Sequence, residues 1–354
     1  MRRIRDQRNG FIRRLKRKVG NTGLDAFLLV DEKDIQYLTG FYSAGAKLLV
    51  PAGKKPVYFI DTMNYNLCST KLSKSGVGEI IQGRVMDSLK HYIKANKIRK
   101  IGLNERSISA FEYRRLLSGI RCRLVHLPLL MESLRQIKIG DEIKTIRKAA
   151  GKTVKIWKEV KKNIEPGMSE KDIRDMVDVL VRALGFENSF PTIVATGTNT
   201  AYPHAIAGGK RFKSGQHLLV DLGILLDGYC SDLTRTYSKG RINRKIADFG
   251  KLVLQAQDKA IKAIKPGVAI CSVVRAVNDF FINNNAGEFV LHGLGHGIGL
   301  NVHERPLLRA DNTERFRKGM VITVEPGLYM PGLGGVRHED MVLVTSKGCE
   351  VLTK

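Results

Sequence analysis

Disulfide-forming cysteine pairs and long apolar runs are two features that this sequence of 354 residues lacks. Its five cysteines lie far apart and form no CxxC pair, which excludes a disulfide framework and a cysteine zinc finger. No apolar run approaches the roughly 18 residues that cross a bilayer, and the arginine-rich start contains no apolar core of a secretory signal. We therefore expect a cytoplasmic protein without a membrane partner.

Acidic residues are few compared with basic ones. The chain has 60 Lys and Arg against 34 Asp and Glu, which gives a formal net charge of +26. Residues 1–140 contain 28 basic and 11 acidic side chains, so the excess lies mainly there. Such a surface attracts polyanions, but no RNA-binding motif or aromatic stacking platform accompanies it. We interpret the charge as solubilising and do not expect a nucleic-acid partner.

The length and the periodicity of the chain predict two domains. A chain of 354 residues is too long for one core, and 43% hydrophobic residues exclude a disordered protein. Short β-rich runs at 26–30, 47–50, 57–60 and 100–103 alternate with helical patterns at 85–95 and 108–117. This alternation predicts an α/β domain over 1–136, followed by a second domain over 137–354.

The second domain contains a weak internal repeat. Two Pro-Gly turns, at 164–167 and 264–267, each follow a long helical stretch and precede a shorter amphipathic helix. Two related halves with a site where they meet are the natural inference.

Four carboxylates border apolar, strand-like runs of this domain, namely Asp221, Asp232, Glu325 and Glu339. An ionised carboxylate beside a buried strand is unfavourable unless a cation compensates it. A glycine-rich string at 292–304 adds His296 among three histidines. The set therefore predicts a pair of divalent metal ions that would lower the pKa of a water molecule. Cys230 is a weaker candidate thiol ligand, and we interpret it as a packing residue.

The order of these five residues, with intervals of 11, 64, 29 and 14, resembles that of the pita-bread metallopeptidases. Within them it is similar to the prolidase and aminopeptidase P branch, whose N-terminal domain carries a segment like Tyr37-Leu38-Thr39-Gly40-Phe41. The resemblance implies a creatinase-type α/β domain at 1–136. It also implies an α+β pita-bread catalytic domain with pseudo-two-fold symmetry at 137–354.

The resemblance also implies a role for each site residue. Asp221 would chelate one metal, His296 and Glu325 the other, and Asp232 and Glu339 would bridge both. We expect Mn(II) first, with Co(II) or Zn(II) as alternatives. Glu325 would also carry a proton during catalysis. The remaining implied site residues are the substrate-side His204, the outer histidines His292 and His303, and Arg337 behind the ligands.

The implied activity is hydrolysis of Xaa-Pro bonds in proline-containing peptides by a homodimer. Dipeptide-specific relatives carry an arginine where this chain has Leu307, so we favour an aminopeptidase that acts on longer peptides. An Xaa-Pro dipeptidase remains the alternative if Arg305 or Arg309 holds the product carboxylate. We also consider a methionine aminopeptidase, a creatinase, and a non-catalytic pita-bread protein that binds RNA or ribosomes.

Overall fold

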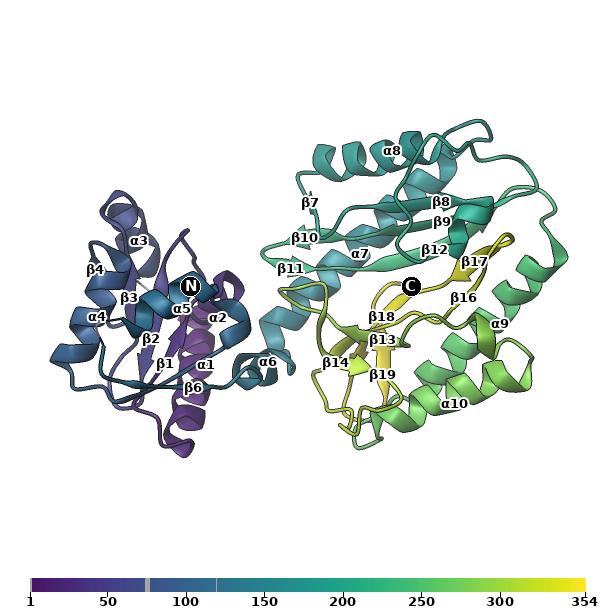
Figure 1. The fold of residues 1–354 in the computed structure, drawn as a ribbon. Helices are drawn as coiled ribbons and strands as arrows, with labels where there is room; N and C mark the ends of the chain where they lie inside the picture. Colours follow the sequence, from purple (N-terminus) through teal and green to yellow (C-terminus); the bar gives the residue numbers. More distant parts are fainter. Residues whose placement is uncertain (1, 74–76, 119) are drawn as a thin grey trace. The chain divides into compact units, whose positions relative to one another are not determined.

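The computed structural model describes residues 2–73, 77–118 and 120–354, with side chains from residue 10 onward. The chain divides into two units, Met1–Arg135 and Gln136–Lys354 (Figure 1). Within the described ranges, no helix is both long enough and apolar enough to cross a membrane.

The first unit is built on a mixed six-stranded sheet in the order β4-β3-β2-β1-β5-β6. β1 pairs antiparallel with β2 and parallel with β5. Every residue of β1, β2 and β3 is buried. Because successive side chains of a strand point to opposite faces, both faces of this sheet are covered. The strands are β1 (Ala26–Leu29), β2 (Lys47–Pro51), β3 (Val57–Ile60), β4 (Glu79–Gln82), β5 (Lys100–Leu103) and β6 (Arg123–His126).

Helices cover this sheet. Leu89 of α4 and Leu116 of α5 join Phe59 of β3 in one apolar cluster, and the ring of Phe11 on α1 stacks on Tyr37 of α2, with centroids 4.2 Å apart. The helices are α1 (Arg2–Asn21), α2 (Glu32–Thr39), α3 (Tyr65–Leu72), α4 (Val85–Ala95), α5 (Ala110–Leu117) and α6 (Leu130–Arg135), with 3-10 turns at Thr62–Asn64 and Glu105–Ser107.

The predicted strands at 57–60 and 100–103 and the predicted helix at 85–95 have the predicted bounds. The helix predicted from residue 108 begins later, at Ala110, because Ser109 caps it. The Ser109 hydroxyl accepts a hydrogen bond from the amide of Glu112 at 3.2 Å, which is the usual role of serine before a first helical turn. β4 and β6 were not among the predicted strands.

The second unit repeats one arrangement twice, and this confirms the predicted pseudo-two-fold symmetry. A Pro-Gly turn separates α7 from α8 and α9 from α10. In the first copy Gly167 N–H donates to Phe212 O at 2.8 Å, and in the second Gly267 N–H donates to Phe316 O at 2.9 Å. In both copies an arginine also donates to the carbonyl of that glycine, at 2.6 Å. The helices are α7 (Gly140–Asn163), α8 (Glu170–Ala183), α9 (Arg244–Ala263) and α10 (Ile270–Asn283).

In each half a helix pair lies beside the strands (Figure 1), and each half has its own apolar core. In the first half β9 pairs antiparallel with β8 and β12, and in the second β15 pairs antiparallel with β13 and β18. The strands of the first half are β7 (Glu187–Asn188), β8 (Ile193–Thr196), β9 (His217–Leu222), β10 (Ile224–Leu226), β11 (Tyr229–Cys230) and β12 (Leu233–Ser238). Those of the second are β13 (Gly295–Gly297), β14 (Glu304–Leu308), β15 (Val321–Val324), β16 (Gly327–Met330), β17 (Gly334–Arg337), β18 (Asp340–Val344) and β19 (Cys349–Val351), and 3-10 turns lie at Gly197–Ala201 and Gly287–Phe289.

A buried acid fixes the start of α7. Glu142 is 4% exposed, and its carboxylate accepts hydrogen bonds from Ile139 N–H at 3.0 Å and from the Tyr229 hydroxyl at 3.1 Å. Burial raises the pKa of Glu142 to about 7, although these hydrogen bonds and Lys138 oppose the rise. Between its ordinary pKa and this value, the folded chain keeps a proton that the unfolded chain has released, so stability falls as pH rises.

We predict that Glu142→Gln removes this loss of stability with rising pH. The melting temperature of the variant relative to the natural chain should increase from pH 5 to pH 8, because a shift of this size corresponds to about 3 kcal/mol at full ionisation. Scanning calorimetry with a chelator present would measure it. Glu159→Gln, an exposed change on the same helix, should give a difference that does not vary over this range. A pH-independent difference for Glu142→Gln would contradict the assignment.

Candidate metal centre

Two antiparallel strand pairs, one from each half of the second unit, present the four predicted carboxylates. Asp221 lies on β9, and Asp232 directly precedes β12, the antiparallel partner of β9. Glu325 directly follows β15, and Glu339 directly precedes β18, the antiparallel partner of β15. The ends of both strand pairs converge, so acids 118 positions apart in the sequence line the same cavity.

The fifth predicted ligand, His296, is the central residue of the short strand β13. A Cβ on Gly295 would lie 2.2 Å from the carbonyl oxygen of Thr323, and a Cβ on Gly297 would lie 2.2 Å from that of Arg305. Such distances are far below van der Waals contact. The backbone therefore requires glycine on both sides of His296, which explains the glycine-rich string in the sequence.

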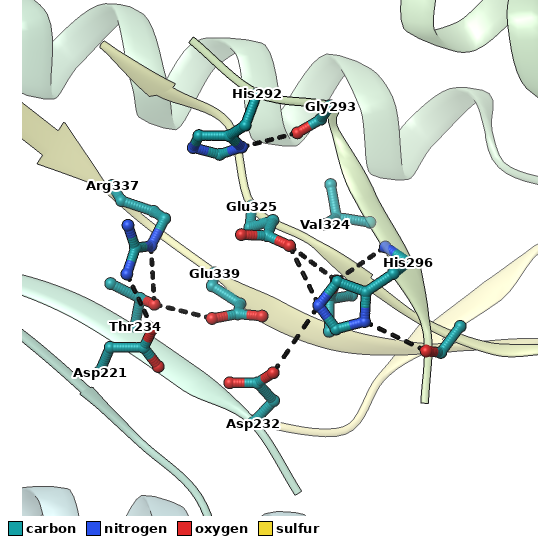
Figure 2. A network of polar contacts seen from close by, with 12 residues as sticks. Asp221, Asp232, Thr234, His292, Gly293, His296, Val324, Glu325, Arg337 and Glu339 are labelled. Atoms are coloured by element: carbon teal, nitrogen blue, oxygen red, sulfur yellow. Dashed lines mark hydrogen bonds and ion pairs between the residues drawn. The ribbon is translucent and has the colours of Figure 1, made fainter. Parts of the chain in front are cut away.

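His296 lies between two of the carboxylates, as Figure 2 shows. Its Nε2 is 3.2 Å from Oε1 of Glu325 and 3.8 Å from Oδ2 of Asp232. Asp232, His296 and Glu339 each offer a ligand atom within 4.8 Å of the others, and all three residues are buried. An imidazole nitrogen with carboxylate oxygens at this spacing is a donor set that divalent metal ions accept.

Three carboxylate oxygens of this cluster have no hydrogen-bond partner among the described residues. They are Oδ1 of Asp221, Oδ1 of Asp232 and Oε1 of Glu339, and all are buried. Leaving a buried charged oxygen unpaired costs several kcal/mol. Three such oxygens in the cavity that His296 also lines fit a group that binds cations, because hydrogen bonds from the described residues do not satisfy them.

Arg337 orders the side of the cluster opposite His296. Its guanidinium donates to Asp221 Oδ2 at 2.7 Å and to the Thr234 hydroxyl at 3.1 Å (Figure 2). It also donates to the Tyr329 hydroxyl at 3.0 Å. The Thr234 hydroxyl in turn donates to Glu339 Oε2 at 2.7 Å. Arg337 is only 3% exposed, so this fixed cation holds two of the acids in place directly and through Thr234.

The electrostatics of the cluster follow from burial and crowding. Burial, and then the neighbouring carboxylates, raise the pKa values of Asp232 and Glu339 well above their ordinary range. Glu325 differs, since the hydrogen bond and charge of His296 outweigh burial and lower the pKa of Glu325 to about 2. The same pairing outweighs burial in His296 and raises the pKa of its ring. The cluster therefore attracts positive charge.

All nine residues predicted for the site line one cavity of about 1060 Å³. The ring of His303 lies 4.4 Å from that of His296 and nearly perpendicular to it. Nε2 of His292 hydrogen-bonds with the Tyr329 hydroxyl at 2.8 Å, and His204 follows the 3-10 turn at Gly197–Ala201. The nine are Asp221, Asp232, His296, Glu325, Glu339, His204, His292, His303 and Arg337.

A buried ion pair holds the loop that carries His303. Nζ of Lys138 is 3.0 Å from Oε2 of Glu304, and the two side chains are 1% and 5% exposed. The other oxygen of Glu304 accepts from Asn301 N–H at 3.1 Å. Cys230 packs beneath this loop in an apolar cluster, and its thiol donates to Leu300 O at 3.6 Å, which agrees with the packing interpretation.

Sequence reasoning missed Thr234, Tyr329 and Lys138. Thr234 lies two residues after Asp232 and opposite Asp221 in the register of β9 and β12, so alternation along the strand could have indicated it. Tyr329 and Lys138 are brought to the site by contacts that have no local signal.

Comparison with known proteins places the chain in a family. Residues 144–346 match the model of metallopeptidase family M24, and residues 12–137 match the creatinase/prolidase N-terminal domain. An uncharacterized peptidase of Staphylococcus aureus is 33% identical over 342 residues, which cover 95% of this chain and 96% of that protein. The chain belongs to metallopeptidase family M24 and carries a creatinase-type N-terminal domain, which confirms the resemblance and the predicted fold.

Solved structures show the same architecture over nearly the whole chain. An Xaa-Pro dipeptidase from Bacillus anthracis is 32% identical, with a TM-score of 0.94 and 98% of both chains covered. A prolidase from Pyrococcus horikoshii is 30% identical, with a TM-score of 0.90 and 98% of both chains covered. An X-Pro aminopeptidase from Thermotoga maritima is 30% identical, with a TM-score of 0.85, covering 94% of this chain and 96% of that one.

Because the buried acids of the cluster repel one another, we predict that removing one of their charges stabilises the metal-free protein. Asp232→Asn should raise the melting temperature of the chelator-treated protein by at least about 2–4 °C, the shift that 1 kcal/mol produces in a domain of this size. The same variant should lose the further stabilisation that Mn(II) gives to the natural chain. Scanning fluorimetry with and without Mn(II) would measure both effects. Asp311→Asn, on an exposed turn, is the control, and destabilisation of the chelator-treated Asp232 variant would contradict the argument.

Proposed function

We propose that this protein hydrolyses the peptide bond that precedes proline and releases the N-terminal residue from peptides of three or more residues. The observation that supports this most strongly is the set of buried, unpartnered carboxylate oxygens, which faces a cavity that three further histidines also line. Family membership supports metal-dependent peptide hydrolysis, and the names of the similar solved structures support the Xaa-Pro bond as its target.

The five ligand-type residues would hold two divalent metal ions. Four carboxylates would neutralise the charge of two such ions, and their oxygens suit Mn(II) first, with Co(II) or Zn(II) as alternatives. When bound, such ions polarise a peptide carbonyl and lower the pKa of a water molecule. The residues concerned are Asp221, Asp232, His296, Glu325 and Glu339.

The side chains of the protein would supply the proton transfers and the orientation. Glu325 lines the cavity and would accept a proton from the attacking water and deliver it to the leaving nitrogen. His303 and His204 line the same cavity and would donate hydrogen bonds to the oxygen on which negative charge develops. His292 is oriented by Tyr329, which Arg337 holds in turn, so it would line the pocket in a fixed position.

Much of the remaining wall of the cavity is apolar and suits a proline ring and the residues beyond it. Phe190 and Pro191 line one part of it, and Ile206, Leu291 and Leu307 line another. The last three are 90%, 56% and 38% exposed. Proline lacks an N–H and has a fixed φ, so apolar contact would favour it over residues that need a hydrogen-bond acceptor. The exposed apolar side chains favour a peptide that continues past proline.

One observation favours the second candidate, an Xaa-Pro dipeptidase. Arg309 lines the cavity, and no ion pair of its guanidinium occurs among the described residues. Arg305, the other candidate from the sequence, pairs with Glu314 at 3.5 Å and is not part of the cavity lining. Arg309 would be the residue that holds the carboxylate of a dipeptide in place of Leu307.

Cleavage assays would separate the two candidates. We predict that protein resupplied with Mn(II) or Co(II) cleaves an Xaa-Pro-Xaa tripeptide faster than an Xaa-Pro dipeptide, with Met-Ala-Xaa as the negative control. Glu325→Gln should lower kcat by about 10²–10⁴-fold, the range for loss of an acid–base group. Measuring the metal content of Glu325→Gln by mass spectrometry shows how much of the loss in kcat comes from weaker metal binding.

Preference for the dipeptide would replace the aminopeptidase with a dipeptidase. Cleavage of Met-Ala-Xaa alone would favour a methionine aminopeptidase, and no cleavage with either metal would contradict the peptidase proposal as a whole.

The role of Arg309 has its own test. If it holds a terminal carboxylate, Arg309→Ala should raise KM for an Xaa-Pro dipeptide by about tenfold or more, the size of a charge-assisted hydrogen bond. KM for a tripeptide amide, which has no carboxylate there, should not change. Arg305→Ala removes an equal charge outside the cavity and is the matched control. If Arg309→Ala raised KM equally for both substrates, contact between Arg309 and the terminal carboxylate would be excluded.

A further inference from the structure

A second cavity, of about 500 Å³, lies within the first unit and is lined by cations. It forms where α4 ends and where β5 and β6 begin. Its lining consists of four basic residues, all exposed, and three isoleucines. These residues are Lys94, Lys97, Arg99 and Arg121, together with Ile93, Ile98 and Ile120.

The turn after α4 brings three of these cations together. Ile98 N–H donates to Ile93 O, and Lys97 N–H donates to Lys94 O, each at 3.1 Å. This hydrogen-bond pair is the Schellman arrangement that ends many helices. It reverses the chain within three residues, so Lys94, Lys97 and Arg99 surround the same hollow.

The neighbouring strand supplies the fourth cation. β5 and β6 are parallel, and Arg123 N–H donates to Arg99 O at 2.7 Å, so the two strands begin side by side. Arg121 therefore enters the hollow next to Arg99. Residues from two separate segments of the chain complete the group.

Lys97 occupies a position that normally takes glycine. Its φ is 51°, in the left-handed region that costs a side-chain-bearing residue about 1–2 kcal/mol. Glycine would avoid this cost and would end the helix equally well. A lysine here is therefore not explained by local backbone preference, and strained residues of this kind gather at functional sites.

The four cations are not neutralised within the protein. Among the described residues, no ion pair or side-chain hydrogen bond is made by Lys94, Lys97, Arg99 or Arg121. Asp25, a carboxylate beside this turn, accepts hydrogen bonds from the backbone N–H groups of Arg99 and Lys100 at 2.7 and 2.9 Å. Four like charges at one hollow repel one another, and an anion bound there would remove that repulsion.

We propose that this cavity binds a chain of two or more linked phosphates, either inorganic or as part of a nucleoside polyphosphate. Four cations around 500 Å³ match a ligand whose negative charge is concentrated, and a single phosphate would leave much of the hollow empty. Among the described residues, the cavity lining contains no aromatic side chain on which a base could stack. Affinity would therefore come from the phosphates, and the isoleucines would form the apolar part of the lining.

Calorimetric titration of the full chain would test this with four probes, namely tripolyphosphate, ATP, AMP and a 12-nucleotide single-stranded RNA. Tripolyphosphate and ATP should bind, with affinities that fall as salt rises from 50 to 200 mM. AMP should bind at least about tenfold more weakly, because it carries a single phosphate. Comparable affinity for tripolyphosphate and ATP would assign recognition to the phosphates, and tighter binding of ATP would identify a nucleoside polyphosphate as the ligand.

Matched variants separate this site from general charge. Lys97→Glu with Arg121→Glu should weaken binding of tripolyphosphate by about tenfold or more. Arg84→Glu with Arg106→Glu changes the net charge equally, but Arg84 precedes α4 and Arg106 follows β5, at the opposite ends of the elements that form the cavity. This second pair should bind as the natural chain does. Both variants should keep their melting transition and their peptidase rate.

Three outcomes would overturn the proposal. One is that neither tripolyphosphate nor ATP binds at 50 mM salt. Another is equal weakening in the two double variants, which would show attraction by net charge alone. The third is binding of the RNA without binding of tripolyphosphate, which would indicate a nucleic-acid surface.

Discussion

Four carboxylates converge in the interior of the second unit, and their repulsion is the constraint on which its architecture depends. Asp221 lies on β9, and the other three acids directly adjoin the end of a strand, so paired backbone fixes the position of each charge. Arg337 is fixed against Asp221, and Thr234 connects it to Glu339, while His296 neutralises Glu325 from the other side. The charge that these groups leave uncompensated is what makes the site bind cations.

Symmetry is the means by which the chain brings the four acids together. The segment from Phe212 to Gly223 and the segment from Phe316 to Gly327 lie 104 positions apart and occupy equivalent places, each a Pro-Gly-anchored strand that ends in an acid. Asp221 and Glu325 are thus equivalent positions in the two halves. One half alone would hold two of the acids, so the cluster exists only because both halves are folded against each other.

Much of this arrangement could be predicted from the sequence because its signals are local. The long helices, the Pro-Gly turns and the acids that border apolar runs are readable within a dozen residues, and the fold they predicted is confirmed. The buried pair of Lys138 and Glu304 could not be predicted, since its members are 166 positions apart and each looks like a surface charge. Arg309 was one of two equal candidates until the cavity lining separated it from Arg305.

The strand β13 affects how this site can evolve. Its two glycines face backbone oxygens so closely that any side chain there would require the sheet to be rebuilt. Position 296, between them, is less restricted, because a ligand side chain smaller than imidazole fits the space that His296 fills. A single substitution can therefore replace this ligand, whereas steric contacts unrelated to metal binding require glycine at the two neighbouring positions. In distant relatives, a pair of glycines around one ligand-type residue would mark this strand even after the metal preference had changed.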